Sequence, residues 1–217
     1  MRKCLKAMLL FITVIAMLTG CGSKEEVSAT DSAKAMFDLL FLGDKTDATS
    51  KLGMSDEEAT QLMDTYKQSQ TTMVKQIFKS SGLEISDEKV EEIYLALVEA
   101  FGKLEYTITE KEGSSAETKT VVFETTYLDF EQVTNNIVGR LTEEVADPTN
   151  ASEVAETFAN IFVEELKNAT PSTEKAIFES EFSLQKFEID GKAKDVWFAS
   201  NPTEFGFNLG MVVTGQK

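Results

Sequence analysis

The spacing of apolar residues changes its period along this chain, and that change most restricts how the chain can fold. Over residues 31–102, apolar side chains recur at the 3.6-residue spacing of helices. Residues 104–109 then alternate apolar and polar side chains, which is the two-residue period of strands, and residues 118–130 are rich in Thr, Val, Phe and Tyr. Helical spacing returns over 131–166, and two strand-like runs follow it. This order of helices, hairpin, helices and hairpin predicts an α+β protein.

The predicted helices carry local start and stop signals. Ser55 and Glu58 form a capping box, in which Ser55 caps the first turn and Glu58 reaches back to it. Gly82 is placed to end that helix as a left-handed cap. The whole pattern predicts helices over 31–42, 55–81, 86–101, 131–145 and 150–166.

Two β-hairpins are predicted. The first joins 104–109 to 118–130, and the second joins 178–189 to 193–199 through Asp190-Gly191, a dipeptide that favours a two-residue hairpin turn. Residues 203–213 suit a last short helix or strand. We expect helices packed on a small antiparallel sheet of these two hairpins. One domain over 31–217 is the economical arrangement, and two smaller domains are the alternative.

The first twenty residues have the features of an export signal. The N-terminal region is positively charged through Arg2, Lys3 and Lys6. It is followed by a mostly apolar run of twelve residues, 7–18. Such a run is too short to span a bilayer stably. It leads to Leu18-Thr19-Gly20-Cys21, which resembles the lipobox of bacterial lipoproteins.

The lipobox resemblance implies how the chain is processed and anchored. In that family a diacylglyceryl group is attached to the cysteine thiol, and a dedicated peptidase cuts before it, here between Gly20 and Cys21. Acylation, for example by palmitate, would then fix Cys21 to the membrane, because two acyl chains hold firmly at about 0.8 kcal/mol for each buried methylene. Residues 1–20 are therefore expected to be a signal peptide and 21–30 a lipidated tether. The domain would face outside the cytoplasm, on the cell membrane.

Charge argues against two kinds of partner surface. The chain has 21 basic and 37 acidic residues, and residues 1–20 contain three of the basic ones and no acid. The processed chain would then have 18 basic against 37 acidic residues, a net charge of −19. That charge repels nucleic-acid phosphates and anionic lipid surfaces. We expect a monomer kept soluble by self-repulsion; a site for cations or basic peptides is the alternative.

The chain has no histidine, which removes several kinds of catalysis. Triads based on histidine and metal sites with histidine ligands need a residue that is absent here. The two cysteines are Cys4, inside the predicted signal, and Cys21. We therefore expect no metal site and no cofactor, and we assign no catalytic residue.

Aromatic residues on the predicted strands are the candidate ligand contacts. Aromatic side chains on a concave sheet can line an apolar pocket, or they can equally fill the core between sheet and helices. The candidates are Tyr106, Phe123, Tyr127 and Trp197. Adjacent acidic residues, such as Glu91-Glu92 and Glu164-Glu165, suit the solvated faces of helices.

Several segments beyond the signal resemble one family of clostridial and bacillar lipoproteins, known as domain of unknown function 5105. The segments are Lys51-Leu-Gly-Met-Ser-Asp-Glu-Glu-Ala59, Thr125-Thr-Tyr127, Asn168-Ala-Thr-Pro-Ser-Thr173 and the ending from Trp197 through Val213-Thr-Gly-Gln216. The resemblance implies a Gram-positive, extracytoplasmic protein. The resemblance implies no particular activity and identifies no functional residues, because the family has no assigned function. The order of elements also resembles nuclear-transport-factor-2-like and cystatin-like folds, an analogy of fold alone.

Three functions fit these observations. The first is a non-catalytic surface lipoprotein whose domain binds a peptide, a cell-wall fragment or a partner protein. The second is a hydrolase of envelope glycans that works through Asp and Glu, which would need two carboxylates converging in a cleft. The third is a structural or chaperone-like envelope component.

Overall fold

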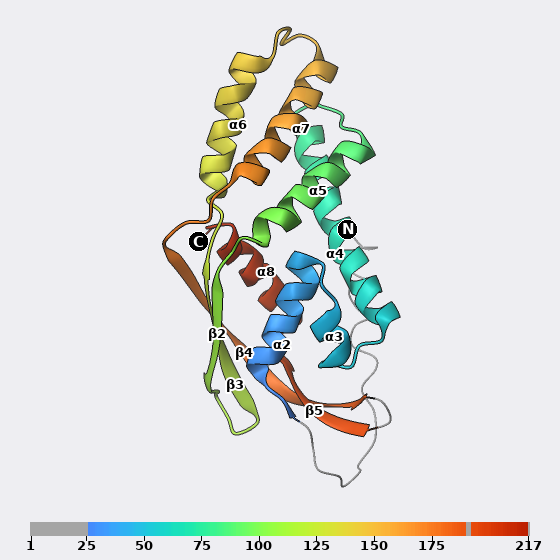
Figure 1. The fold of residues 1–217 in the computed structure, drawn as a ribbon, viewed down its shortest axis with the longest axis vertical. Coiled ribbons are helices and arrows are strands. Elements are labelled where there is room, and N and C mark those ends of the chain that lie inside the picture. Colours follow the sequence, from blue (N-terminus) through green and yellow to red (C-terminus); the bar gives the residue numbers. More distant parts are fainter. Residues whose placement is uncertain (1–25, 190–191, 217) are drawn as a thin grey trace.

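The computed structural model describes residues 26–189 and 192–216, which form a curled five-stranded sheet and a set of helices (Figure 1). The order across the sheet is β1-β5-β4-β3-β2. The strands are β1 (Glu26–Val27), β2 (Tyr106–Glu112), β3 (Thr118–Thr126), β4 (Lys175–Ile189) and β5 (Lys192–Ala199). The predicted α+β class is confirmed.

The sheet has five strands and is not the predicted sheet of two hairpins. Strands β2 to β5 pair antiparallel, with Phe123 of β3 opposite Phe178 of β4. Strand β1 pairs parallel with β5, with Glu26 opposite Asp195. Residues 26–30, which the sequence assigns to the tether, form β1, the N-cap Ser28 and the start of α2. The predicted hairpin turn Asp190-Gly191, the signal peptide and Cys21 lie outside the described residues.

Each predicted helix is present, and further helical segments join them. The helices are α2 (Ala29–Phe37), the π-helix η2 (Asp38–Leu42), α3 (Thr46–Ser50), α4 (Asp56–Ser80), α5 (Asp87–Phe101), α6 (Phe130–Glu144), α7 (Ala151–Asn168) and α8 (Pro202–Val213). The expected helix over 31–42 is thus α2 continued by η2. The segment 203–213, left open between helix and strand, is the helix α8.

The signals at the ends of α4 act as the sequence predicts. The Ser55 hydroxyl accepts a hydrogen bond from the backbone N–H of Glu58, and the Glu58 carboxylate accepts one of 2.8 Å from the backbone N–H of Ser55. Gly82 follows the helix with a φ of 73°, a left-handed conformation that glycine adopts without a steric penalty. These local interactions fix where the longest helix begins and ends.

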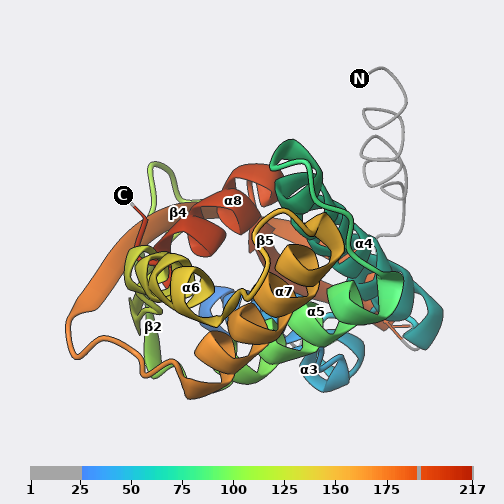
Figure 2. The ribbon, with the colours of Figure 1, turned by 90° about the horizontal axis from the view of Figure 1, so that it is seen from above.

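The strands lie toward one end of an elongated molecule, and α6 and α7 form the opposite end (Figure 1). Helices α2 and α8 pack against strands of the sheet, while α5 and α6 both pack on α7. The view from above shows α6 and α7 lying side by side at the end away from the strands (Figure 2). One core cluster draws buried residues from α2, α4, α5, α7, α8 and the sheet, so these elements share one hydrophobic interior.

Candidate functional site

Phe123 lies at the centre of an aromatic cluster between the sheet and α2. It is fully buried, and its ring centroid is 5.4 Å from that of Phe37 and 5.3 Å from that of Tyr106. Phe178, opposite it on β4, is 5.7 Å away and continues the cluster to Phe205 of α8. Around Phe123, side chains from α2 and α8 occupy the space above the strands.

Tyr127, another candidate ligand contact, lies just after β3 and away from this cluster. Its hydroxyl is 3.4 Å from Oε2 of Glu174, and its ring packs against Gly215, where an added Cβ would be 2.6 Å from the ring. Gly215 has a φ of 69°. The tyrosine therefore holds the C-terminal turn close to the β3–α6 connection.

Trp197 lies on β5, the strand that pairs with β1. Its indole N–H donates a hydrogen bond of 2.5 Å to Oε1 of Glu26 on β1, although 171 positions separate the two residues. The ammonium of Lys119 sits 4.8 Å from the centre of the indole ring, within the range of a cation–π interaction, and also pairs with Glu110 at 2.5 Å. The Trp197 side chain is buried and its polar atom is already bonded.

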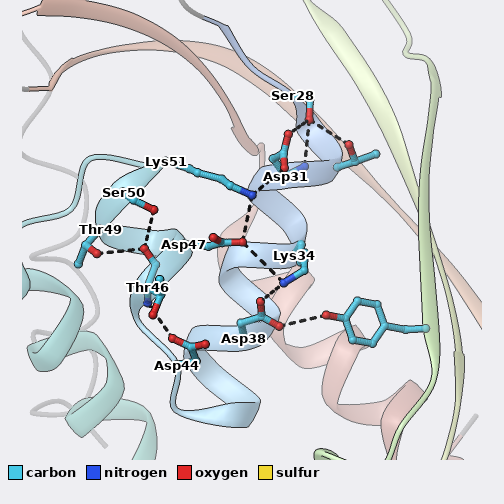
Figure 3. Close-up of polar contacts among 12 residues, drawn as sticks. Ser28, Asp31, Lys34, Asp38, Asp44, Thr46, Asp47, Thr49, Ser50 and Lys51 are labelled. Atoms are coloured by element: carbon cyan, nitrogen blue, oxygen red, sulfur yellow. Dashed lines mark hydrogen bonds and ion pairs between the residues drawn. The ribbon is translucent and has the colours of Figure 1, made fainter.

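A chain of alternating acidic and basic side chains joins α2 and η2 to α3 (Figure 3). Lys51 is 3.1 Å from both Asp31 and Asp47, and Lys34 bridges Asp47 and the buried Asp38. Asp38 also accepts a hydrogen bond of 3.1 Å from the hydroxyl of Tyr106 on β2. We call Asp31, Lys34, Asp38, Asp47, Lys51 and Tyr106 the Asp/Lys cluster.

Four groups of the Asp/Lys cluster, Asp31, Lys34, Lys51 and Tyr106, have pKa values shifted away from neutral pH. The hydrogen bond to Asp38 raises the pKa of Lys34 to about 12, and bonds to Asp31 and Asp47 raise the pKa of Lys51. The Ser28 hydroxyl lowers the pKa of Asp31, and burial raises the pKa of Tyr106. A general acid or base works best with a pKa near the working pH. These four groups therefore suit a structural role, in which they hold the short helix α3 against α2.

Two of the hollows formed by the described residues lie between helices. The larger, about 450 Å³, runs between α4 and α5. Its charged walls are internally paired, with Lys67 2.5 Å from Glu91 and Lys75 2.6 Å from Asp87. The smaller, about 180 Å³, lies between the start of α6 and the end of α7. Ligand pockets are predominantly apolar with a few converging polar groups, and neither polar hollow matches that description.

Within residues 26–189 and 192–216, the structure contains no group of three or more acidic, cysteine or histidine side chains placed to hold a metal ion. In the same part of the chain no helix has the length and apolarity to cross a membrane. The predicted lipid site Cys21 and the cleavage position after Gly20 lie outside the described residues, so they stay predictions. The ligand-binding role of Tyr106, Phe123, Tyr127 and Trp197 also stays a prediction.

The sequence singled out Tyr106 as a candidate ligand contact, but it did not single out Glu26 or the acidic and basic residues of the Asp/Lys cluster. Two ion pairs of the cluster could have been found from spacing alone, because their partners are four residues apart, as in ion pairs along a helix. These pairs are Lys34 with Asp38 and Asp47 with Lys51. The links from Lys34 to Asp47 and from Glu26 to Trp197 depend on tertiary packing, which local spacing does not reveal.

The fold is similar to that of a protein from Bacillus subtilis, ycdA, whose crystal structure is provisionally described as that of a lipoprotein. The two structures align with a TM-score of 0.62 at 18% sequence identity. The alignment covers 84% of this chain and 56% of ycdA, so the chain spans little more than half the length of that protein. No protein-family model and no curated protein sequence matches the chain. At this identity the likeness is one of fold.

Proposed function

We propose that this chain is a bacterial lipoprotein, anchored outside the cytoplasm through a lipid on Cys21, whose domain is a non-catalytic binding or interaction module. The observation that carries the proposal is the leader: a positive start, twelve mostly apolar residues and the sequence Leu18-Thr19-Gly20-Cys21. The fold shared with a Bacillus subtilis protein provisionally described as a lipoprotein supports it. Membership of domain of unknown function 5105 and a Gram-positive origin belong to the same proposal.

A module that interacts through its surface fits the packing better than a pocket for a small molecule. Phe123 and Trp197 are buried among other side chains, and the hydroxyl of Tyr106 is bonded to Asp38. The lysines of the Asp/Lys cluster have raised pKa values and stay protonated at neutral pH, so they do not serve as bases. The partner would be a peptide, a cell-wall fragment or another protein.

Replacing the sulfur atom of Cys21 with oxygen tests the lipid anchor. In Cys21→Ser the hydroxyl cannot form the thioether to the lipid, so the protein should accumulate as an unprocessed precursor or leave the membrane fraction. Mass spectrometry of the wild-type protein should show a chain beginning at position 21 with added acyl mass. Cys4→Ser is the matched control, because Cys4 lies within the predicted signal and should not affect lipid attachment. Unchanged membrane retention of Cys21→Ser would refute the proposal.

The interaction module is tested separately from the anchor. Residues 26–217, produced without the leader, should be stabilised by a cognate peptide or wall fragment, because a ligand that binds only the folded state raises the unfolding temperature. Phe207→Ala, which changes an exposed ring on α8, and Phe123→Ala, which changes a buried one, distinguish binding at the surface from binding over the sheet. If no peptide, wall sugar or envelope protein shifts the transition, the binding role is wrong even where the anchor is confirmed.

A further inference from the structure

The position of Glu26 in the sheet restricts how the domain can sit on a membrane. Glu26 is paired with Asp195 and bonded to Trp197, so it is fixed to the sheet. Five residue steps separate Cys21 from Glu26. Even a fully extended chain covers at most about 3.6 Å per residue, so Glu26 lies within ~18 Å of an anchored Cys21. The tether is therefore too short to let the domain turn freely.

Strand β1, which follows the proposed attachment point in the sequence, lies at one end of the long axis. Strand β1 and the turn between β2 and β3 are at the sheet end, while the connection between α6 and α7 is at the opposite end (Figure 1). Helix α6 packs on α7, and this pair forms the part of the molecule furthest from β1. An anchor at β1 thus places the sheet end near the bilayer.

The distribution of charge favours the same orientation. Residues 130–168, which contain α6 and α7, have eight acidic and two basic residues, a net charge of −6. Residues 106–126 and 175–199, which contain β2 to β5 and the β2–β3 turn, together have nine acidic and six basic residues, a net charge of −3. Anionic lipid therefore repels the α6–α7 segment more strongly than it repels the strands. The helical end is therefore the end that avoids an anionic surface.

We infer that the domain stands upright on the membrane, with its sheet end, formed by β1, β5 and the β2–β3 turn, facing an anionic bilayer and the α6–α7 pair pointing away from it. This inference rests on the proposed lipid anchor. The short reach from Cys21 and the repulsion of the acidic α6–α7 pair act in the same direction. The surface left open to partners outside the membrane is then the helical end.

Energy transfer from a dye on the protein to the bilayer tests this orientation. The processed chain has no cysteine besides the lipidated Cys21, so a single new cysteine can be labelled selectively. Ala116→Cys, in the β2–β3 turn, and Ala151→Cys, at the start of α7, are matched substitutions at exposed positions. With the full lipoprotein in vesicles of phosphatidylglycerol and phosphatidylcholine that carry an acceptor on the headgroups, transfer should be more efficient from position 116 than from 151.

Two further measurements separate the effect of the short tether from the effect of charge repulsion. An insertion of about twelve Gly and Ser residues after Ser23 adds roughly 20 Å of average reach to the tether. The difference in transfer efficiency between positions 116 and 151 should therefore become smaller. Vesicles of phosphatidylcholine alone should reduce it as well, because they do not repel the acidic helices. Equal transfer from 116 and 151, or more from 151, in protein that floats with the vesicles overturns the orientation and leaves the anchor intact. Protein that does not float with the vesicles overturns both.

Discussion

Trp197 donates its indole N–H to Oε1 of Glu26 over 2.5 Å, and this bond fastens the first strand of the fold to the fifth. Glu26→Ala removes the acceptor and leaves the donor of a buried ring without that partner. We expect a loss of about 1–3 kcal/mol of unfolding free energy, because a buried donor is left without its acceptor. Trp197 is the single tryptophan of the chain, so its fluorescence should change as well. Glu117→Ala, at an exposed position, is the control and should alter neither quantity.

Phe123→Ala separates a core position from a pocket wall. The side chain is fully buried among Phe37, Tyr106 and Phe178, so its truncation should cost about 3–5 kcal/mol in denaturant unfolding. Phe207, which is 65% exposed on α8, gives the matched control and should change stability by less than about 0.5 kcal/mol. Near-equal effects of the two variants would contradict the packing described for Phe123.

The bond between Tyr106 and Asp38 should be visible as a coupling energy. Tyr106→Phe removes only the hydroxyl that donates to Asp38. In a double-mutant cycle with Asp38→Ala, we expect the pair to be coupled by about 1 kcal/mol. Tyr127→Phe is the control, because its hydroxyl lies 3.4 Å from an exposed glutamate. If the effects of Tyr106→Phe and Asp38→Ala add independently, the two side chains do not interact in solution.

The capping box predicts a pH dependence at the start of α4. The backbone N–H and the hydroxyl of Ser55 both bond to the Glu58 carboxylate and lower its pKa below 4.5. A carboxyl whose pKa is lowered by folding stabilises the protein above its unfolded pKa, and that stability is lost as the pH falls through the folded pKa. The difference in stability between wild type and Glu58→Gln should therefore be constant at neutral pH and shrink below 4.5.

The matched control for the capping box is Glu57→Gln. It removes the same charge from the same first turn of α4 without touching the bond to Ser55. In urea unfolding at acidic pH, the stability difference between wild type and Glu57→Gln should change less with pH than the difference between wild type and Glu58→Gln. Identical pH profiles for the two variants would assign the effect to the helix dipole and not to the capping box.

Two glycines near the C-terminus should respond in opposite directions to alanine. At Gly215 a Cβ would lie 2.6 Å from the Tyr127 ring, and the φ of 69° disfavours any side chain, so Gly215→Ala should destabilise the protein by about 1–3 kcal/mol. Gly210 is inside α8, where nothing lies within 4 Å of an added Cβ. Gly210→Ala should stabilise the protein by about 0.5–1 kcal/mol. Thermal unfolding measures both.

The helices were predictable because their signals are local. Ser55, Glu58 and Gly82 act on neighbours a few residues away, so the bounds of α4 follow from the sequence. The hairpin of β2 and β3 followed from the change of period. The π-helix η2 was missed because the sequence Asp-Leu-Leu-Phe-Leu continues the apolar pattern of α2 without a break.

Strand β1 could not be predicted because nothing local defines it. Glu26 and Val27 stand in a short polar stretch, and they form a strand only because β5 offers an edge to pair with. The same limit applies to the candidate site. Alternation along β3 places Phe123 on one face of the sheet, but only the packing of α2 and α8 decides that this face is filled.

The parallel pairing of β1 with β5 also sets the order in which the protein can be completed. Glu26 leaves the ribosome early, yet its partner Asp195 is made 169 positions later. The sheet therefore cannot close until almost the whole polypeptide exists, and contacts so distant along a chain form slowly. This delay suits the export that we propose for the chain, because a sheet that lacks its last strand cannot complete its pairing before that strand has crossed the membrane.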